Sequence, residues 1–192
     1  MFELLLIIIF FIVFFIFIKK SQNEVSNVPS DVDGHRYLVR NLEDKDKAAN
    51  MLAKIRKNMM ILKDHLVENK DTKYKDMKPY IEQLDRNLKN VVINESGENS
   101  SYTSYSVNKG KEIVFCLRSK RNNKLHDLNL VMYVALHELG HVGCPEYGHT
   151  DLFKQIFAFF TEVAMEIGLY EKIYFNIDPA EYCGITITES IV

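Results

Sequence analysis

Cysteine is scarce in this sequence, and its scarcity argues against a disulfide-stabilised fold. The 192 residues include three cysteines, Cys116, Cys144 and Cys183, which are widely spaced and odd in number. Small secreted domains that depend on disulfides carry an even and denser set. We therefore expect no disulfide framework and a reducing compartment. The length beyond the N-terminus suits one ordinary domain.

The sequence also lacks an excess of charge of either sign. Lysine and arginine total 24 against 26 acidic residues, so the formal net charge is -2 and does not indicate nucleic-acid binding. A local basic run, residues 109–124, contains Glu112 as its single acid. A solvated loop is the commoner explanation of such a run, and no aromatic residue lies within 118–124 to stack on bases. Nucleic acid is therefore disfavoured as a partner.

The N-terminus is a long apolar run that lacks the features of a cleavable signal peptide. Residues 4–18 are all Leu, Ile, Val or Phe, with no Lys or Arg before them and no small-residue cleavage site after them. The run ends at Lys19 and Lys20 instead. We therefore predict an uncleaved transmembrane helix within residues 1–20, in preference to a signal peptide. The positive-inside rule then predicts a single-pass membrane protein whose C-terminal domain is cytoplasmic.

Residues 21–34 form a polar segment, which we predict to tether this anchor to one domain formed by residues 35–192. Two apolar stripes with helical spacing open that domain. They predict amphipathic helices over roughly residues 43–68 and 76–91. A short polar break separates them, so we expect a helical hairpin that covers the core.

The second half of the domain is predicted to mix strands and helices. Residues 105–107 and 112–117 flank an Asn-Lys-Gly turn, which is typical of a β-hairpin. Residues 129–142 read as a buried helix, and Thr150 is a good N-cap for another buried helix that ends at Gly168. The expected fold is α+β: a mainly helical domain with a small β-hairpin or sheet beside helix 129–142, preceded by the transmembrane helix.

Helix 129–142 carries a pattern typical of metal sites. His137, Glu138 and His141 form an H-E-x-x-H motif, and His149 follows after seven intervening residues. Because positions i and i+4 lie on one helix face, His137 and His141 can present two imidazoles to one ion. Catalytic zinc takes three protein ligands and keeps one position for water. We predict that His137, His141 and His149 bind Zn²⁺ and that Glu138 is the general base toward zinc-activated water.

The third ligand has two rivals. Glu162 would lie on the following helix, which supplies a glutamate ligand in many H-E-x-x-H enzymes, and Cys144 lies close to His141. We favour His149, because the Gly- and Pro-containing segment 143–148 can reverse the chain and return it to the site. Tyr147, Tyr174 and Tyr182 are each candidates to donate a hydrogen bond to a developing oxyanion.

At residues 137–153 the chain resembles the zincin metallopeptidases, especially the small WLM, SprT and YgjP-like group. That group has H-E-L-x-H, a short turn, a third His and an apolar helix carrying an aromatic residue, which correspond here to His137 to His141, His149 and Phe153. The rest of the chain resembles membrane-anchored WLM-like proteins of large DNA viruses and algae. The resemblance implies a zincin-like domain that hydrolyses peptide bonds of protein substrates with zinc.

Two functions of different classes follow from these residues. The first is a zinc metalloendopeptidase whose partners are a protein or peptide substrate and, through the anchor, a membrane. The alternative is a membrane-tethered zinc-binding interaction module without catalytic activity. Glu138 favours the enzyme, because a structural zinc has no use for a base beside an open coordination position.

Overall fold

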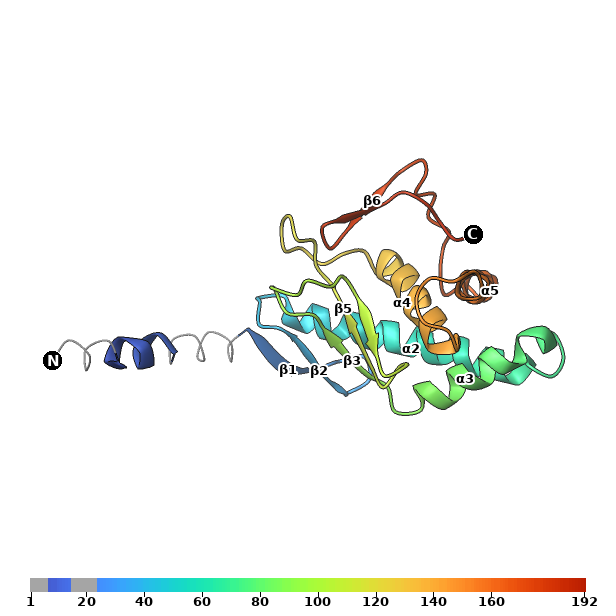
Figure 1. The fold of residues 1–192 in the computed structure, drawn as a ribbon, viewed down its shortest axis with the longest axis horizontal. Coiled ribbons are helices and arrows are strands. Elements are labelled where there is room, and N and C mark those ends of the chain that lie inside the picture. Colours follow the sequence, from blue (N-terminus) through green and yellow to red (C-terminus); the bar gives the residue numbers. More distant parts are fainter. Residues whose placement is uncertain (1–6, 15–23) are drawn as a thin grey trace.

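The computed structural model describes residues 7–14 and 24–192 (Figure 1). From residue 24 onward, α-helices combine with small sheets, so the α+β class expected from the sequence is confirmed. In chain order the elements are β1 (Val25–Pro29), β2 (Arg36–Arg40), α2 (Lys45–Asn69), the 3-10 turn η1 (Lys75–Met77), α3 (Lys78–Leu88), β3 (Val92–Glu95), β4 (Tyr105–Val107), β5 (Glu112–Phe115), α4 (Leu128–Gly143), α5 (Asp151–Glu166), β6 (Ala180–Tyr182) and β7 (Ile185–Ile187).

A three-stranded sheet lies beside the central helix α4, in the strand order β3-β5-β4. β4 and β5 are antiparallel, with Val107 opposite Glu112, which confirms the predicted hairpin. β3 joins β5 as a parallel strand, with Val92 opposite Glu112. Among the described strands β4 pairs with β5 alone, so it is the edge of the sheet on the side of α4.

Helix α4 is the centre of the core, where it contacts α2, α3, α5 and the sheet (Figure 1). Twelve of its 16 residues are buried, which a run as apolar as Leu130 to Leu136 favours. The four that retain exposure are Leu128, Asn129, His137 and His141. The two histidines therefore mark the one stretch in the middle of α4 that the surrounding elements leave open.

The predicted N-terminal transmembrane helix is wrong. Within residues 7–14 and 24–192, no helix is long and apolar enough to cross a membrane. The eight residues described as helical, 7–14, would span about 12 Å at 1.5 Å per residue, against a hydrocarbon core of about 30 Å. The rest of the apolar run, residues 4–6 and 15–18, lies outside the described residues. The single-pass topology and the cytoplasmic placement were inferred from this helix, so they are not supported either.

The folded domain also begins before its predicted boundary at residue 35. Residues 25–29, which fall in the predicted tether, form β1 and pair antiparallel with β2. Val28 is buried in this hairpin, and the hairpin packs against α2. Only two apolar residues, Val25 and Val28, lie in β1, so alternation gave little signal for a strand.

The basic run 109–124 is not one continuous surface. Arg118 is only 2% exposed, and its guanidinium donates to Glu95 at 2.7 Å and pairs with Asp44 at 2.7 Å. Lys109 at the other end of the run donates to backbone carbonyls of the α4–α5 connection. Both residues therefore serve contacts within the domain.

Candidate metal centre and cleft

The first two histidines of the site are set by the geometry of α4. Asp127 caps this helix by accepting the backbone N–H of Asn129 at 2.8 Å. His137 and His141 lie one turn apart on the face that remains open, and their Nε2 atoms are 3.2 Å apart. Helical spacing alone thus brings two ligand atoms together.

The third histidine arrives through a short turn between α4 and α5. Gly148 has φ +81°, a left-handed conformation that suits glycine, and it turns the chain back toward α4. Thr150 then caps α5 by accepting the N–H of Phe153. His149 lies between these two fixed points, 3.2 Å from His141 and 3.1 Å from His137, measured between Nε2 atoms.

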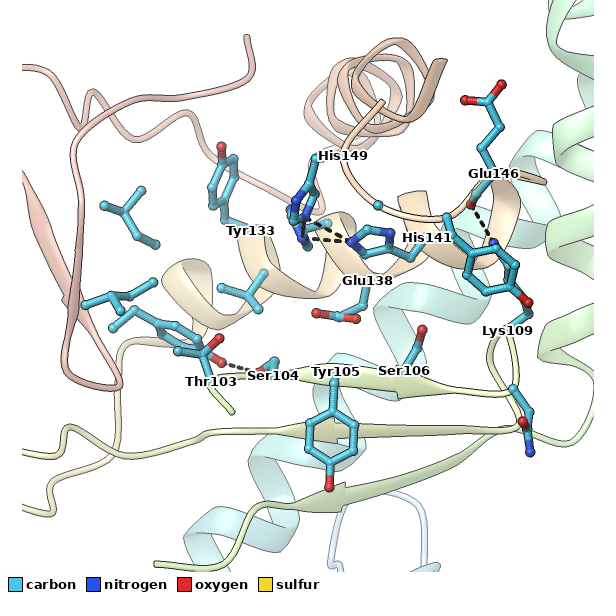
Figure 2. Close-up of a pocket in the computed structure, with 18 residues that line it drawn as sticks. Thr103, Ser104, Tyr105, Ser106, Lys109, Tyr133, Glu138, His141, Glu146 and His149 are labelled. Atoms are coloured by element: carbon cyan, nitrogen blue, oxygen red, sulfur yellow. Dashed lines mark hydrogen bonds between the residues drawn. The ribbon is translucent and has the colours of Figure 1, made fainter. Parts of the chain in front are cut away.

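The three Nε2 atoms form a triangle of the size that a metal ion requires (Figure 2). All of these ligand atoms lie within 4.8 Å of one another, so the three histidines are close enough to bind a metal ion. Tetrahedral zinc with bonds of about 2.0–2.1 Å separates its nitrogen ligands by about 3.3–3.4 Å, close to the distances found here. Each neutral Nε2 either donates or accepts, so three of them cannot all pair with one another. Three converging lone pairs, in contrast, satisfy a cation.

The electrostatics around the two helical histidines favour neutral imidazoles. Burial, with the charges of its two histidine neighbours, lowers the pKa of His137 to about 3. Burial also lowers the pKa of His141 to about 4, assisted by His149 and Lys109. Metal binding requires deprotonated imidazole. At neutral pH, protons therefore compete little with a metal ion for these two side chains.

Phe153 on α5 supports all three rings. It stacks on His141 with ring centroids 4.1 Å apart and meets His137 and His149 edge-on, each at 5.0 Å. Gly140 allows α5 to approach so closely, because a Cβ there would lie 3.0 Å from the Phe153 ring. The aromatic residue singled out by the sequence therefore packs directly behind the ligands.

Glu138 lies beside the triangle on the same helix. Figure 2 shows its carboxylate pointing from α4 into the space between the histidines and β4. The residue is 4% exposed, and burial raises the pKa of its carboxyl to about 7. A bound cation stabilises a nearby carboxylate and would lower this pKa again. Glu138 is thus placed to exchange a proton with a group held in front of the histidines.

The histidines and Glu138 open into a cleft of about 640 Å³. Its walls come from β4, from α4, from the α4–α5 connection and from the β6–β7 hairpin, which contributes Tyr182, Ile185 and Ile187. Among the described residues, Tyr105 and Ser106 of the edge strand β4 line the side opposite α4. Figure 2 shows the Ser106 side chain turned toward α4 and the Tyr105 ring turned away from it. A molecule that enters the cleft would therefore reach the three histidines along an edge strand.

A disulfide fixes the β6–β7 wall, contrary to the expectation from the cysteine count. Cys116, directly after β5, is bonded to Cys183 in the β6–β7 turn, 67 residues later. Cys144 is a buried free thiol. Disulfides persist in oxidising surroundings, so the expected reducing compartment does not fit this pair. The neighbouring Tyr182 adds a second tie, a 2.6 Å hydrogen bond between its hydroxyl and that of Ser104.

The other sequence candidates are placed as follows. Tyr147 and Tyr182 line the cleft, whereas Tyr174 is 58% exposed and is not among the residues that line it. Sequence reasoning missed Tyr133, which lines the cleft one turn before His137 on α4. The i, i+4 relation of Tyr133 to His137 was a signal for this position. Its hydroxyl accepts the backbone N–H of Ile191 at 3.0 Å.

The rival third ligands lie outside the histidine cluster. Glu162 is exposed on α5, and Cys144 is buried at the end of α4. We expect His149→Ala to weaken metal binding by about a hundredfold or more, because a ligand bond is lost, while Glu162→Ala leaves it unchanged. Competition with a chromophoric chelator measures both. The reverse pattern would assign the third position to Glu162.

Comparison with known proteins finds relatives in viruses. The chain is 47% identical over 174 residues to "Uncharacterized protein R325" of Acanthamoeba polyphaga mimivirus, covering 91% of this chain and 88% of that protein. Shorter matches are "Uncharacterized protein 136R" of Invertebrate iridescent virus 6, 38% identical over 36% of this chain and 39% of that protein, and "Uncharacterized protein 042R" of Invertebrate iridescent virus 3, 43% identical over 35% and 42%. No family model and no solved structure matches the chain.

Proposed function

The chain belongs to the same family as protein R325 of Acanthamoeba polyphaga mimivirus, and we propose that its domain is a zinc-dependent metallopeptidase that hydrolyses peptide bonds of protein substrates. The observation that carries this proposal is the triangle of Nε2 atoms from His137, His141 and His149, with the Glu138 carboxylate beside it in an open cleft. A purely structural metal would be enclosed by a fourth protein ligand. Among the described residues the candidate ligands are three, and they face a cleft.

The three histidines and Glu138 are the groups that this chemistry requires. His137, His141 and His149 would hold the zinc ion, which when bound would lower the pKa of a water molecule and polarise a substrate carbonyl. Glu138 accepts the proton that the water loses and passes it to the leaving amine nitrogen, so one carboxylate serves both steps. Its buried position beside the histidines suits this role, because a desolvated carboxylate has a higher proton affinity than an exposed one.

The edge strand β4 is a reason to propose a polypeptide as the substrate. Its partner within the sheet is β5, and Tyr105 and Ser106 line the cleft opposite α4. An extended peptide can add to such an edge through main-chain hydrogen bonds, largely independent of its sequence. That placement would lay a peptide bond across the front of the histidines and Glu138. Affiliation with the WLM and SprT group remains a prediction from the motif.

The decisive experiment measures bound metal and proteolysis on the same full-length preparation. We expect about one zinc per chain and cleavage of an unfolded protein such as casein, loss of cleavage with 1,10-phenanthroline, and its return on adding zinc. Zinc without cleavage would support the zinc-binding interaction module instead. A chain that binds no zinc would contradict both functions.

A further inference from the structure

The segment that delivers His149 to the site is largely exposed. Between the end of α4 and His149, the residues Pro145 to Gly148 all lie at the surface, and Tyr147 is 85% exposed. His149 is itself exposed, in contrast to the partly buried ligands on α4. The third ligand therefore depends on a surface loop, which ordinarily is more mobile than the helix that it leaves.

One side chain from another part of the fold holds this loop. The ammonium of Lys109 donates to the carbonyl of Cys144 at 2.8 Å and to that of Glu146 at 2.7 Å. The same nitrogen lies 4.3 Å from the ring centroid of Tyr147, a cation–π distance. Figure 2 shows Lys109 beneath the loop, joined to Glu146 and on the far side of His141 from His149.

The backbone around Lys109 is shaped to make this contact. Lys109 is in the turn between β4 and β5, where Asn108, Lys109 and Gly110 have φ values of +49°, +55° and +103°. Gly110 is pressed against the end of α4, since a Cβ there would meet the Val142 side chain at 2.8 Å. Only glycine fits this approach, which fixes the base of the Lys109 side chain beside the loop.

We propose that Lys109 is a positioning residue for the metal centre: it clasps residues 144–147 and thereby keeps His149 within reach of His137 and His141. The ammonium has three N–H donors, and two of them are directed at loop carbonyls while the charge faces Tyr147. It is therefore committed to the loop rather than to a substrate carboxylate. The inference rests on the metal site of the proposed function and is independent of proteolytic activity.

A metal-affinity comparison tests the clasp. Zinc affinity is measured by chelator competition on the full chain for the natural sequence, Lys109→Met, Lys109→Arg and the control Lys111→Met, whose exposed side chain lies on the same turn. Outer-shell partners of metal ligands typically contribute about 10–100-fold to affinity, and we expect a loss of that size for Lys109→Met. Lys109→Arg should recover most of it, because it keeps both the charge and the donors. Equal affinity of Lys109→Met and the natural chain would overturn the proposal.

A second background separates positioning from general stability. If Lys109 acts through His149, Lys109→Met should have little further effect on zinc affinity in a His149→Ala chain. The same fold-loss in both backgrounds would overturn the proposal, since the effect would then reach the site by another route. This comparison stays informative even if Lys109→Met lowers the melting temperature.

A readout without metal keeps the clasp distinct from the proposed function. Glutamyl endopeptidase cuts after Glu146 only when the loop can open, so zinc-free Lys109→Met should be cut there faster than zinc-free Lys111→Met. Equal rates would overturn the clasp. Failure of the peptidase proposal has a different signature, namely zinc binding without casein cleavage.

Discussion

Glu138→Gln is expected to keep zinc and to lose proteolysis. The amide has the shape of the carboxylate but cannot accept the proton of water, and general base catalysis contributes about 10²–10⁴-fold to rate. Glu138 is not part of the histidine cluster, so the zinc content should stay at that of the natural chain. The measurement is kcat/KM for casein cleavage together with zinc per chain.

The matched control for this variant is Glu162→Gln. Glu162 is exposed on α5, so this substitution makes the same chemical change at a position away from the cleft. It should retain both zinc and activity. Burial raises the pKa of the Glu138 carboxyl, which means that the fold tolerates a neutral side chain there, and Glu138→Gln should remain folded. Full activity in Glu138→Gln would remove Glu138 from the mechanism.

The candidate site could be predicted because its determinants are local in sequence. His137, Glu138 and His141 occupy one helix, where the spacing fixes their faces, and His149 follows after one short turn. The cap at Thr150 was equally readable, and α5 begins at the next residue. For such features the sequence distance is small, so few conformations compete with the observed one.

Features that join distant segments could not be predicted in the same way. The parallel pairing of β3 with β5 and the clasp of Lys109 on residues 144–147 depend on how whole elements pack. Periodicity describes the faces of an element but does not name its neighbour. The cysteine count failed for the same reason, since it gave no indication that two residues 67 positions apart would meet.

The transmembrane prediction failed for a different reason. It rested on an apolar run from residue 4 to residue 18 that reads as a short span, on the absence of signal-peptide features and on the lysines that follow the run. A span needs about 20 consecutive apolar residues in one helix. The helices within residues 7–14 and 24–192 do not meet that requirement.

Removal of the Cys116–Cys183 disulfide is expected to cause a large loss in the free energy of unfolding. The bond closes a loop of 67 residues, and a chain-entropy estimate for such a loop is about 4 kcal/mol. The double variant Cys116→Ser/Cys183→Ser should therefore lose about 4 kcal/mol in free energy of unfolding, measured by denaturant titration. Reductant should reduce the stability of the natural chain to a similar level and should not affect the double variant.

The same variant should alter the cleft wall and leave the metal site largely unchanged. Tyr182, Ile185 and Ile187 flank Cys183 and line the cleft, whereas the three histidines lie on α4 and the α4–α5 connection. Loss of the bond should therefore raise KM for casein while zinc affinity changes little. Cys144→Ala is the control, because its thiol is free and the sensitivity to reductant should persist. If the natural chain unfolds identically with and without reductant, the bond does not hold this wall, and the Ser104–Tyr182 hydrogen bond and apolar packing must do so.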